Sequence, residues 1–164
     1  MPAKISFGLS QREVKDAVRQ IEQVRRNLPN KAKELVRRLT EMGVDIAKAK
    51  LVEFEAIDTW FLHDSIDSYF SESAGVGLIH TGNCLYAVFV EFGTGIIGKR
   101  NPHPMGSADK YDGKEHGEDG WIYFDPARQQ FRWTKGFYSR PFMYETAKDL
   151  EELCHQVAKE VGLV

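Results

Sequence analysis

Three glycines in the middle of the chain have the spacing of a phosphate-binding loop. Gly93, Gly95 and Gly98 fit the pattern GxGxxG, and Lys99 follows them. That chemistry requires the glycines to lead from a strand straight into a helix whose N-terminal amides hold phosphate. The residues that follow read Lys-Arg-Asn-Pro-His-Pro, and two prolines two positions apart disfavour a helix. No acidic residue stands at the expected offset after a second strand, so we expect neither dinucleotide binding nor any other cofactor.

Metal and nucleophile chemistry find no better support. The histidines are scattered along the chain, at His63, His80, His103, His116 and His155. None has another histidine three or four residues away, which zinc sites often use. His103 and His116 share a polar segment with several carboxylates, and we favour a solvated loop there over a weak metal site. No serine or cysteine lies in a nucleophile-elbow pattern. We therefore predict no metal site, no catalytic residue and no enzymatic activity.

Basic side chains gather in two stretches that could contact nucleic acid. One lies on a predicted helix and consists of Arg25, Arg26, Lys31, Lys33, Arg37 and Arg38. The other is the segment 131–140, whose rings could stack on bases. Alternation in that segment favours an ordinary strand with Phe131 and Trp133 inward and Arg132 and Thr134 outward. A solvated helix face for the first stretch and this ordinary strand for the second are the simpler interpretations, and a nucleic-acid-binding or nuclease-like module remains the alternative function.

Composition is that of an ordinary globular protein. The 164 residues are 42% hydrophobic and 28% charged, which predicts one domain over residues 1–164. The net charge of −2 combines +3 in residues 1–60 with −5 in residues 61–164, and no strongly basic domain is present. Cys84 and Cys154 form no CxxC pair, so we expect buried, reduced thiols and a cytosolic setting. No apolar run approaches the roughly 18 residues of a membrane span, and no membrane partner is expected.

The first third of the chain is predicted to be helical. Residues 4–9 alternate as a short strand, and residues 10–13 have capping-box spacing. A first apolar stripe follows, at Val14, Val18, Ile21, Val24 and Leu28. Pro29 should break or restart the helix, and Asn30 can cap a second one. The second stripe consists of Leu35, Leu39, Met42, Ile46 and Ala49. We expect a helical N-terminal region over residues 10–55.

The most apolar run of the chain, residues 85–92, precedes the glycines. Its short length allows either a buried strand or a short helix. Its aromatic and β-branched content favours the strand, whereas Asn83 as cap and Gly93 as terminator favour the helix. We prefer the helix because Leu85, Phe89 and Phe92 would then share one face. Glu91 would point away from that face.

The remaining elements predict an α+β fold. Strands near 4–9, 64–72, 76–81, 121–125 and 130–134 would form a mainly antiparallel sheet packed against helices. The glycine-rich, polar residues 93–120 predict a long mobile loop. Arg140 and Pro141 open a C-terminal helix with proline in its first turn. We expect one core that contains Phe89, Phe92, Phe142, Leu150 and Val157.

Two segments, taken together, resemble a known family. Residues 86–95 contain Tyr-Ala followed by Val-Glu-Phe-Gly-Thr-Gly, and residues 140–143 read Arg-Pro-Phe-Met at the start of the terminal helix. This ordered pair resembles the tail-component family of tailed bacteriophages, which are small proteins of the head–tail neck called tail-completion or minor tail proteins. A variable polar loop and a Trp/Tyr-rich hairpin separate the two segments. The resemblance covers roughly residues 60–160.

The resemblance implies a structural role without catalysis. It implies assembly as a homo-oligomeric ring, with a hexamer as the expected size, between the head and the tail tube. Other neck or tail proteins would be its partners, and genomic DNA would pass through without specific binding. It implies localisation in the virion, and in the host cytoplasm during assembly. A ring needs two different surfaces on each subunit, and the charge asymmetry is consistent with that. The candidate interface residues are Glu91, Gly93, Thr94, Gly95, Lys99, Arg100 and Arg140.

Overall fold

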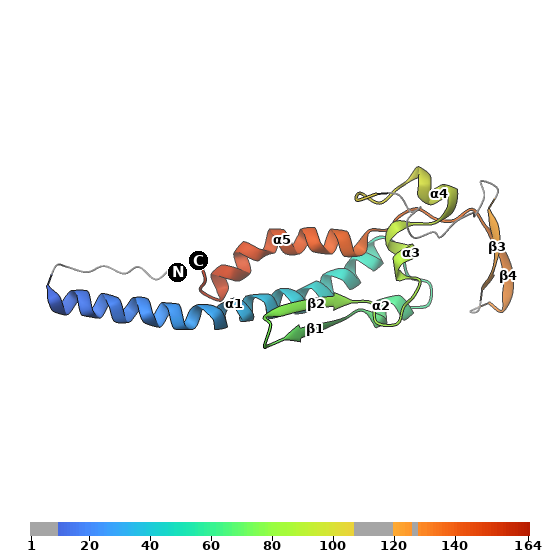
Figure 1. Ribbon diagram of the computed structural model, residues 1–164. Coiled ribbons are helices and arrows are strands. Elements are labelled where there is room, and N and C mark those ends of the chain that lie inside the picture. The colour runs from blue at the N-terminus through green and yellow to red at the C-terminus, as the bar shows by residue number, and fades with distance from the viewer. Residues whose placement is uncertain (1–9, 107–119, 126–127) are drawn as a thin grey trace. The chain divides into compact units, whose positions relative to one another are not determined.

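The computed structural model describes residues 10–106, 120–125 and 128–164 (Figure 1). In chain order the elements are α1 (Gln11–Glu53), α2 (Phe61–Ser65), β1 (Asp67–Ser71), β2 (Val76–His80), α3 (Ala87–Phe92), α4 (Gly95–Arg100), β3 (Trp121–Asp125), β4 (Gln130–Thr134) and α5 (Phe142–Glu160). Helices dominate and the strands pair antiparallel, so the predicted α+β class is confirmed. No helix in the described ranges is both long enough and apolar enough to cross a membrane.

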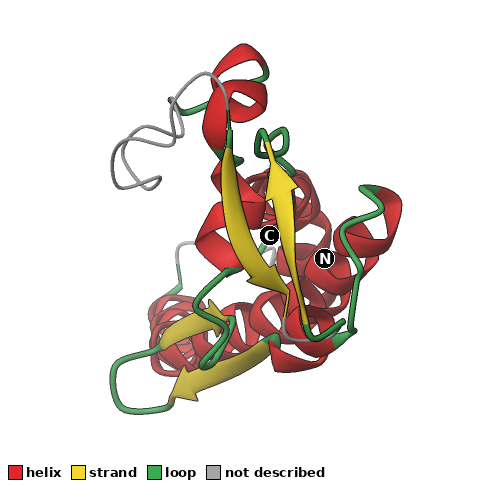
Figure 2. Ribbon diagram, turned by 90° about the vertical axis from the view of Figure 1, so that its right-hand side faces the viewer, coloured by secondary structure: helices red, strands yellow, loops and turns green. Residues whose placement is uncertain are grey.

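The described strands form two separate hairpins and do not join in one sheet. β1 pairs with β2, and β3 pairs with β4 (Figure 2). In the second hairpin Trp121 lies opposite Thr134 and Asp125 lies opposite Gln130. The antiparallel pairing is as predicted, but the expectation of one common sheet is wrong. The strand predicted at 4–9 lies outside the described residues.

The first helix runs through Pro29 without a break. The predicted division at Pro29, with a new cap at Asn30, is therefore wrong. Proline lacks an N–H and crowds the preceding turn, which costs about 3 kcal/mol inside a helix. Its φ near −65° is nevertheless helical, and the apolar period continues on both sides. The segment therefore stays helical and forgoes one hydrogen bond.

Both the start and the middle of α1 are stabilised by side chains. Ser10 and Glu13 form the predicted capping box, in which the Glu13 amide donates to Ser10 Oγ (3.3 Å) and the Ser10 amide donates to Glu13 Oε2 (3.2 Å). The Ser10 hydroxyl and amide hold the pKa of Glu13 below its ordinary value. Further along, Arg37 pairs with Glu34 (2.8 Å) and Glu41 (2.6 Å). Such pairs one turn apart support an exposed helix.

The chain groups into two compact units. The first comprises the described residues up to Met42, Ser68–Leu78 and Leu150–Val164. Its parts are joined by charged contacts: Lys31 Nζ donates to the Gly162 carbonyl (2.6 Å), and Arg38 pairs with Glu160 (3.7 Å). Val157 is buried in this unit, at 2% exposure.

The second unit comprises Gly43–Asp67 and Ile79–Asp149 and contains the larger core. Its buried residues are Ala47, Leu51, Leu62, Ile66, Cys84, Ala87, Val90 and Phe142. The predicted core is correct for Phe142. Val157 and Leu150 belong to the first unit, and Phe89 and Phe92 are only half-buried, so the expectation of one shared core is wrong. Cys84 is a buried free thiol, as predicted, whereas the free thiol of Cys154 is half-buried.

Candidate functional site

The two segments that carry the family resemblance meet in the second unit. We call them together the clasp: residues 90–95, at the end of α3, and residues 137–144, which lead into α5. The helix preferred for the apolar run is confirmed, and the strand alternative is wrong. The helix begins after Tyr86, which makes no side-chain cap, so the predicted cap at Asn83 is wrong as well.

Two glycines let the chains of the clasp approach each other. Gly93 ends α3 with φ 75°, and a Cβ there would lie 2.6 Å from the Ser139 amide nitrogen and 2.8 Å from the Phe137 carbonyl oxygen. Gly95 has φ 59°, and a Cβ there would lie 2.5 Å from the Lys135 carbonyl oxygen. A side chain at either position would therefore meet both an unfavourable backbone conformation and a steric clash.

Backbone hydrogen bonds join the two segments over most of their length. The Thr94 amide donates to the Phe137 carbonyl (2.9 Å), and the Phe137 amide donates back to the Thr94 carbonyl (3.2 Å). The Arg140 amide donates to the Val90 carbonyl (2.9 Å). The Ser139 hydroxyl donates to the Glu91 carbonyl (2.5 Å). These backbone and side-chain hydrogen bonds connect the two segments of the clasp and thereby fix the residue at which α5 begins.

Glu91 is the central side chain of the clasp. Only 8% of the residue is exposed, and its carboxylate accepts the amides of Met143 (2.9 Å) and Tyr144 (3.0 Å) in the first turn of α5. The first amides of a helix lack partners within the helix, and its N-terminus favours negative charge. Glu91 therefore caps α5 from another helix. The prediction that it points away from the buried face is wrong, and Leu85, predicted on that face, is 88% exposed.

His103 completes the polar centre of the clasp. Its Nδ1 accepts the Met105 amide (3.0 Å), which leaves Nε2 to donate to Glu91 Oε1 (3.0 Å). The imidazole is 3% exposed and lies against the rings of Phe92 (4.4 Å between centroids) and Tyr144 (5.2 Å). The solvated loop predicted around His103 is therefore wrong at this residue. His116 lies outside the described residues.

Arg140 and Thr94 contribute two buried polar atoms to the clasp. The Arg140 guanidinium lies over the ring of Tyr138 (4.8 Å) and near that of Phe137 (5.8 Å). Among the described residues, its Nε has no hydrogen-bond partner although it is buried, and the same holds for Thr94 Oγ1. Stacking on aromatic rings is the contact that compensates the arginine.

The other candidate residues, Lys99 and Arg100, are exposed at the end of α4. This helix corrects two expectations, because residues 95–100 are helical where a loop was predicted and the GxGxxG glycines do enter a helix. The helix follows α3 and not a strand, and it has only six residues, so it lacks the geometry of a dinucleotide site. Residues 107–119 of the predicted loop lie outside the described residues.

Most of the basic cluster on α1 is already paired within the protein. Arg37 and Arg38 both donate to Glu34 and lower its pKa to about 2. Lys33 lies 3.9 Å from Glu72. Together with Lys31, which bonds the Gly162 carbonyl, these residues are engaged by neighbouring groups. Across the described ranges, moreover, no group of three or more His, Cys, Asp or Glu side chains is placed to hold a metal ion.

The second hairpin carries an exposed apolar surface, which we call the hairpin face. It consists of Ile122, Phe124, Phe131 and Trp133, with exposures of 67%, 47%, 74% and 58%. The register pairs Ile122 with Trp133 and Phe124 with Phe131, so all four share one side. The inward orientation predicted for Phe131 and Trp133 is wrong, since no described element covers them.

Asp125 lies on the opposite side of that hairpin, where it accepts hydrogen bonds from two arginines. It is 4% exposed and accepts Arg128 Nη1 (2.9 Å) and Arg132 Nη1 (3.5 Å). Burial by itself would raise the pKa of Asp125, but the hydrogen bonds from Arg128 outweigh it and lower the pKa. Arg128 and Arg132 are therefore turned toward an internal carboxylate.

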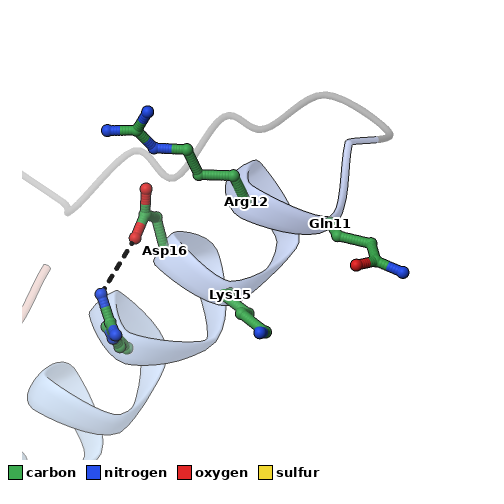
Figure 3. A pocket seen from close by; sticks show the side chains of 5 residues that line it. Gln11, Arg12, Lys15 and Asp16 are labelled. Carbon is green, nitrogen blue, oxygen red and sulfur yellow. Dashed lines mark hydrogen bonds and ion pairs between the residues drawn. The ribbon is translucent and has the colours of Figure 1, made fainter.

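The first half of α1 carries a second exposed apolar surface, the α1 stripe. It consists of Val14, Val18, Ile21, Val24 and Leu28, which are 41–52% exposed. Nearby, at the start of the helix, a shallow hollow is lined by Gln11, Arg12, Lys15, Asp16 and Arg19 (Figure 3). All five are exposed side chains of one helix, and Arg19 pairs with Asp16 (3.3 Å). The hollow has no buried polar group with which to select a ligand.

The seven candidate residues thus divide into two sets. Glu91, Gly93, Thr94 and Gly95 are buried and Arg140 is half-buried, all within the clasp, whereas Lys99 and Arg100 lie on the surface. Sequence reasoning missed His103 as a member of the clasp. The prolines on both sides of it, which restrict the backbone, are the one local signal of a fixed position.

Comparisons of the chain with protein-family models, with curated proteins and with solved structures found no match.

Proposed function

We propose that this chain is a structural virion protein of a tailed phage or prophage, without catalytic activity. It acts in the neck or in tail completion at the head–tail junction, as a ring of identical subunits. Other neck or tail proteins are its partners, and genomic DNA passes the ring without specific binding. Its location is the virion, after assembly in the host cytoplasm.

The observation that carries the proposal is the clasp. The resemblance rests on two short segments, and each of them alone is a modest signal. In the fold they contact each other directly, with Glu91 of one segment capping the helix that the other segment begins. Residues that must fit one another are expected to occur as an ordered pair, whatever the length of the chain between them. The pairing therefore supports reading both segments as one signature.

The exposed apolar surfaces support an assembly role. The hairpin face and the α1 stripe each present large apolar side chains to solvent. Contiguous exposed apolar patches on a globular protein commonly mark sites of protein–protein contact. Two different patches on one subunit are what a ring of head-to-tail contacts requires.

The alternative, a nucleic-acid-binding or nuclease-like module, is weaker on electrostatic grounds. Phosphate binding needs basic groups that are free to neutralise phosphates. Of the α1 cluster, Lys31, Lys33, Arg37 and Arg38 have partners within the protein. In the hairpin, Arg132 faces the buried Asp125.

Deletion of the gene from the phage or prophage that encodes it tests the proposal. We expect DNA-filled heads and separate tails that do not join, with complete particles restored when the wild-type chain is supplied in trans. Electron microscopy of the lysates distinguishes these outcomes. Complete, infectious particles without the chain would refute the proposal. A DNA-binding titration of the purified protein at several salt concentrations is the companion test, and tight binding with a steep salt dependence would favour the alternative.

A further inference from the structure

The hairpin face leaves four large apolar side chains exposed, which favours a partner that covers them. A two-stranded hairpin is marginal by itself, and three or more strands or a packed helix are normally needed. Here the side that carries Asp125 has its own ion pairs, whereas none of the described elements covers the hairpin face. A helix with an apolar stripe is the usual cover for such a face.

The α1 stripe has the dimensions of that cover. From Val14 to Leu28 it extends about 21 Å at 1.5 Å per residue. A five-residue strand extends about 17 Å. The stripe therefore matches the hairpin in length, and a helix packed along the strands would contact both β3 and β4.

The two surfaces together offer enough area for a specific contact. From their exposures, the hairpin face presents about 400 Å² of apolar surface, mainly from its three rings. The α1 stripe presents about 300 Å² from five half-exposed aliphatic side chains. Since apolar atoms make up somewhat more than half of a typical interface, the whole contact would bury about 1,100 Å². That passes the area of about 1,000 Å² expected of a biological interface.

The charges also favour contact between a hairpin face and an α1 stripe over contact between two hairpin faces or two α1 stripes. Arg25 lies three and four residues from Leu28 and Ile21, within the α1 stripe, and no described residue is paired with it. Trp133 already has Lys135 Nζ over its ring (5.5 Å), but over the hairpin face the Arg25 guanidinium would meet the ring of Phe131, a favourable cation–π contact. Two α1 stripes packed in parallel would instead bring two Arg25 side chains together. Pairing of like surfaces would also leave the other surface of each chain exposed.

We propose that the hairpin face of one copy of this chain packs on the α1 stripe of a second copy. Each copy then uses both surfaces, one toward each neighbour. Such a head-to-tail contact closes into a ring if the rotation permits it. The inference rests on the proposed function only for ring closure, because the contact itself follows from the two surfaces.

Two variants each disrupt one of the two surfaces, and a mixture of the two variants tests whether the remaining intact surfaces bind each other. Ile21→Asp places a charge in the α1 stripe, and Phe131→Asp places one in the hairpin face. Both positions are more than half exposed, so each variant should fold. Gln23→Asp, on the opposite side of α1, and Tyr123→Asp, on the opposite side of the hairpin where position 123 lies across from Arg132, are the matched controls. Light scattering across a concentration series measures the mass of each full-length protein, and circular dichroism confirms its helix content.

The expected results are specific to a contact between unlike surfaces. Wild type and both controls form species several times 18.7 kDa, and each Asp variant is at least tenfold weaker in self-association. A mixture of the two Asp variants forms a dimer and nothing larger, because only one intact hairpin face meets one intact α1 stripe. A monomeric wild type, or a mixture that stays monomeric, overturns the inference. Undiminished association of either Asp variant alone overturns it too, since like surfaces would then be pairing.

These outcomes are distinguishable from failure of the proposed function. If deletion of the gene separates heads from tails while the purified wild type stays monomeric, the neck role stands and this contact is wrong. If the contact forms as described but particles assemble normally without the chain, the association is real and the neck role is wrong.

Discussion

Replacing Glu91 with alanine removes the acceptor on which the start of α5 depends. Three donors lose their partner at once: the amides of Met143 and Tyr144, and Nε2 of His103. Hydrogen bonds to a charged group contribute about 1.5–3 kcal/mol each, and buried donors left unpaired are costly. Water can reach part of the opened site, so the losses will not add fully. We expect Glu91→Ala to lower the free energy of unfolding by about 3–5 kcal/mol.

Urea denaturation followed by circular dichroism measures this loss. With a slope of about 1–3 kcal/mol per molar urea, the midpoint should fall by about 2 M. Glu91→Gln keeps the shape and one carbonyl acceptor but turns an amide group toward donors, so we expect it to recover about half of the loss. Glu145→Ala is the matched control. Glu145 also lies in the first turn of α5, where it pairs with Lys148 on a partly exposed surface, so its loss should be about 1 kcal/mol or less.

The reasoning would be refuted by equal effects at Glu91 and Glu145. In that case the carboxylate would act only through its charge near the helix terminus, and the hydrogen bonds of the clasp would be incidental. A loss below about 1 kcal/mol for Glu91→Ala would have the same meaning, because it is what a solvated carboxylate contributes.

Three further predictions concern the fold around the clasp. Gly93→Ala should destabilise the second unit by about 2–4 kcal/mol in the same urea assay, since it adds a Cβ 2.6 Å from the Ser139 nitrogen at φ 75°; an unchanged midpoint would mean that this backbone shifts freely. Phe142→Ala should cost about 3–5 kcal/mol because the ring is 1% exposed, whereas Phe89→Ala, at a half-buried position, should cost distinctly less. The lowered pKa of Asp125 contributes stability that is fully present above its ordinary value of 3.8 and is lost as the pH falls through the lower folded value; the wild-type hairpin should weaken below pH 3.8 by nuclear magnetic resonance, and Asp125→Asn should abolish that dependence.

The elements that the sequence predicted best are those with a local cause. The capping box at Ser10, the end of α3 at Gly93 and the strands at 121–125 and 130–134 follow from short-range chemistry, and all are present. Pro29 is the exception among local signals. Proline weakens a helix by a definite amount, but it does not fix the end of the helix when helical residues continue on both sides.

Glu91 could not be placed from the sequence, and the reason is physical. Periodicity arguments assume that a charged side chain prefers water, which is true of an isolated helix. The amides that compensate its burial belong to residues 143 and 144, more than fifty positions away in the chain. Only tertiary structure brings those donors to it. The same applies to His103, whose partner Glu91 is supplied by another helix.

The prediction that the side chains of the hairpin face point inward was wrong for the opposite reason, because it assumed a tertiary contact that the described residues do not make. Alternation correctly showed that Phe131 and Trp133 lie on the same side of β4, but alternation gives only the side and not what covers it. The expectation that they point inward assumed a cover within the same chain. The described residues leave that side exposed. The predicted side is therefore correct, and the prediction that Phe131 and Trp133 are buried is wrong.

Substitutions in the buried clasp and substitutions in the two exposed surfaces should therefore impair the protein in different ways. Substitutions in the clasp, at Glu91 or Gly93, alter hydrogen bonds and steric fit inside one unit, so they should lower the stability of the monomer. Substitutions in the hairpin face or the α1 stripe remove at most an exposed contact, such as that between the rings of Phe124 and Phe131 (5.3 Å), so they should lower stability by about 1 kcal/mol or less and weaken association. A loss of particles caused by Glu91→Ala would then be restored by lowering the assembly temperature, because unfolding is favoured by heat. A loss caused by Phe131→Asp would persist at every temperature, because the missing contact belongs to the interface itself.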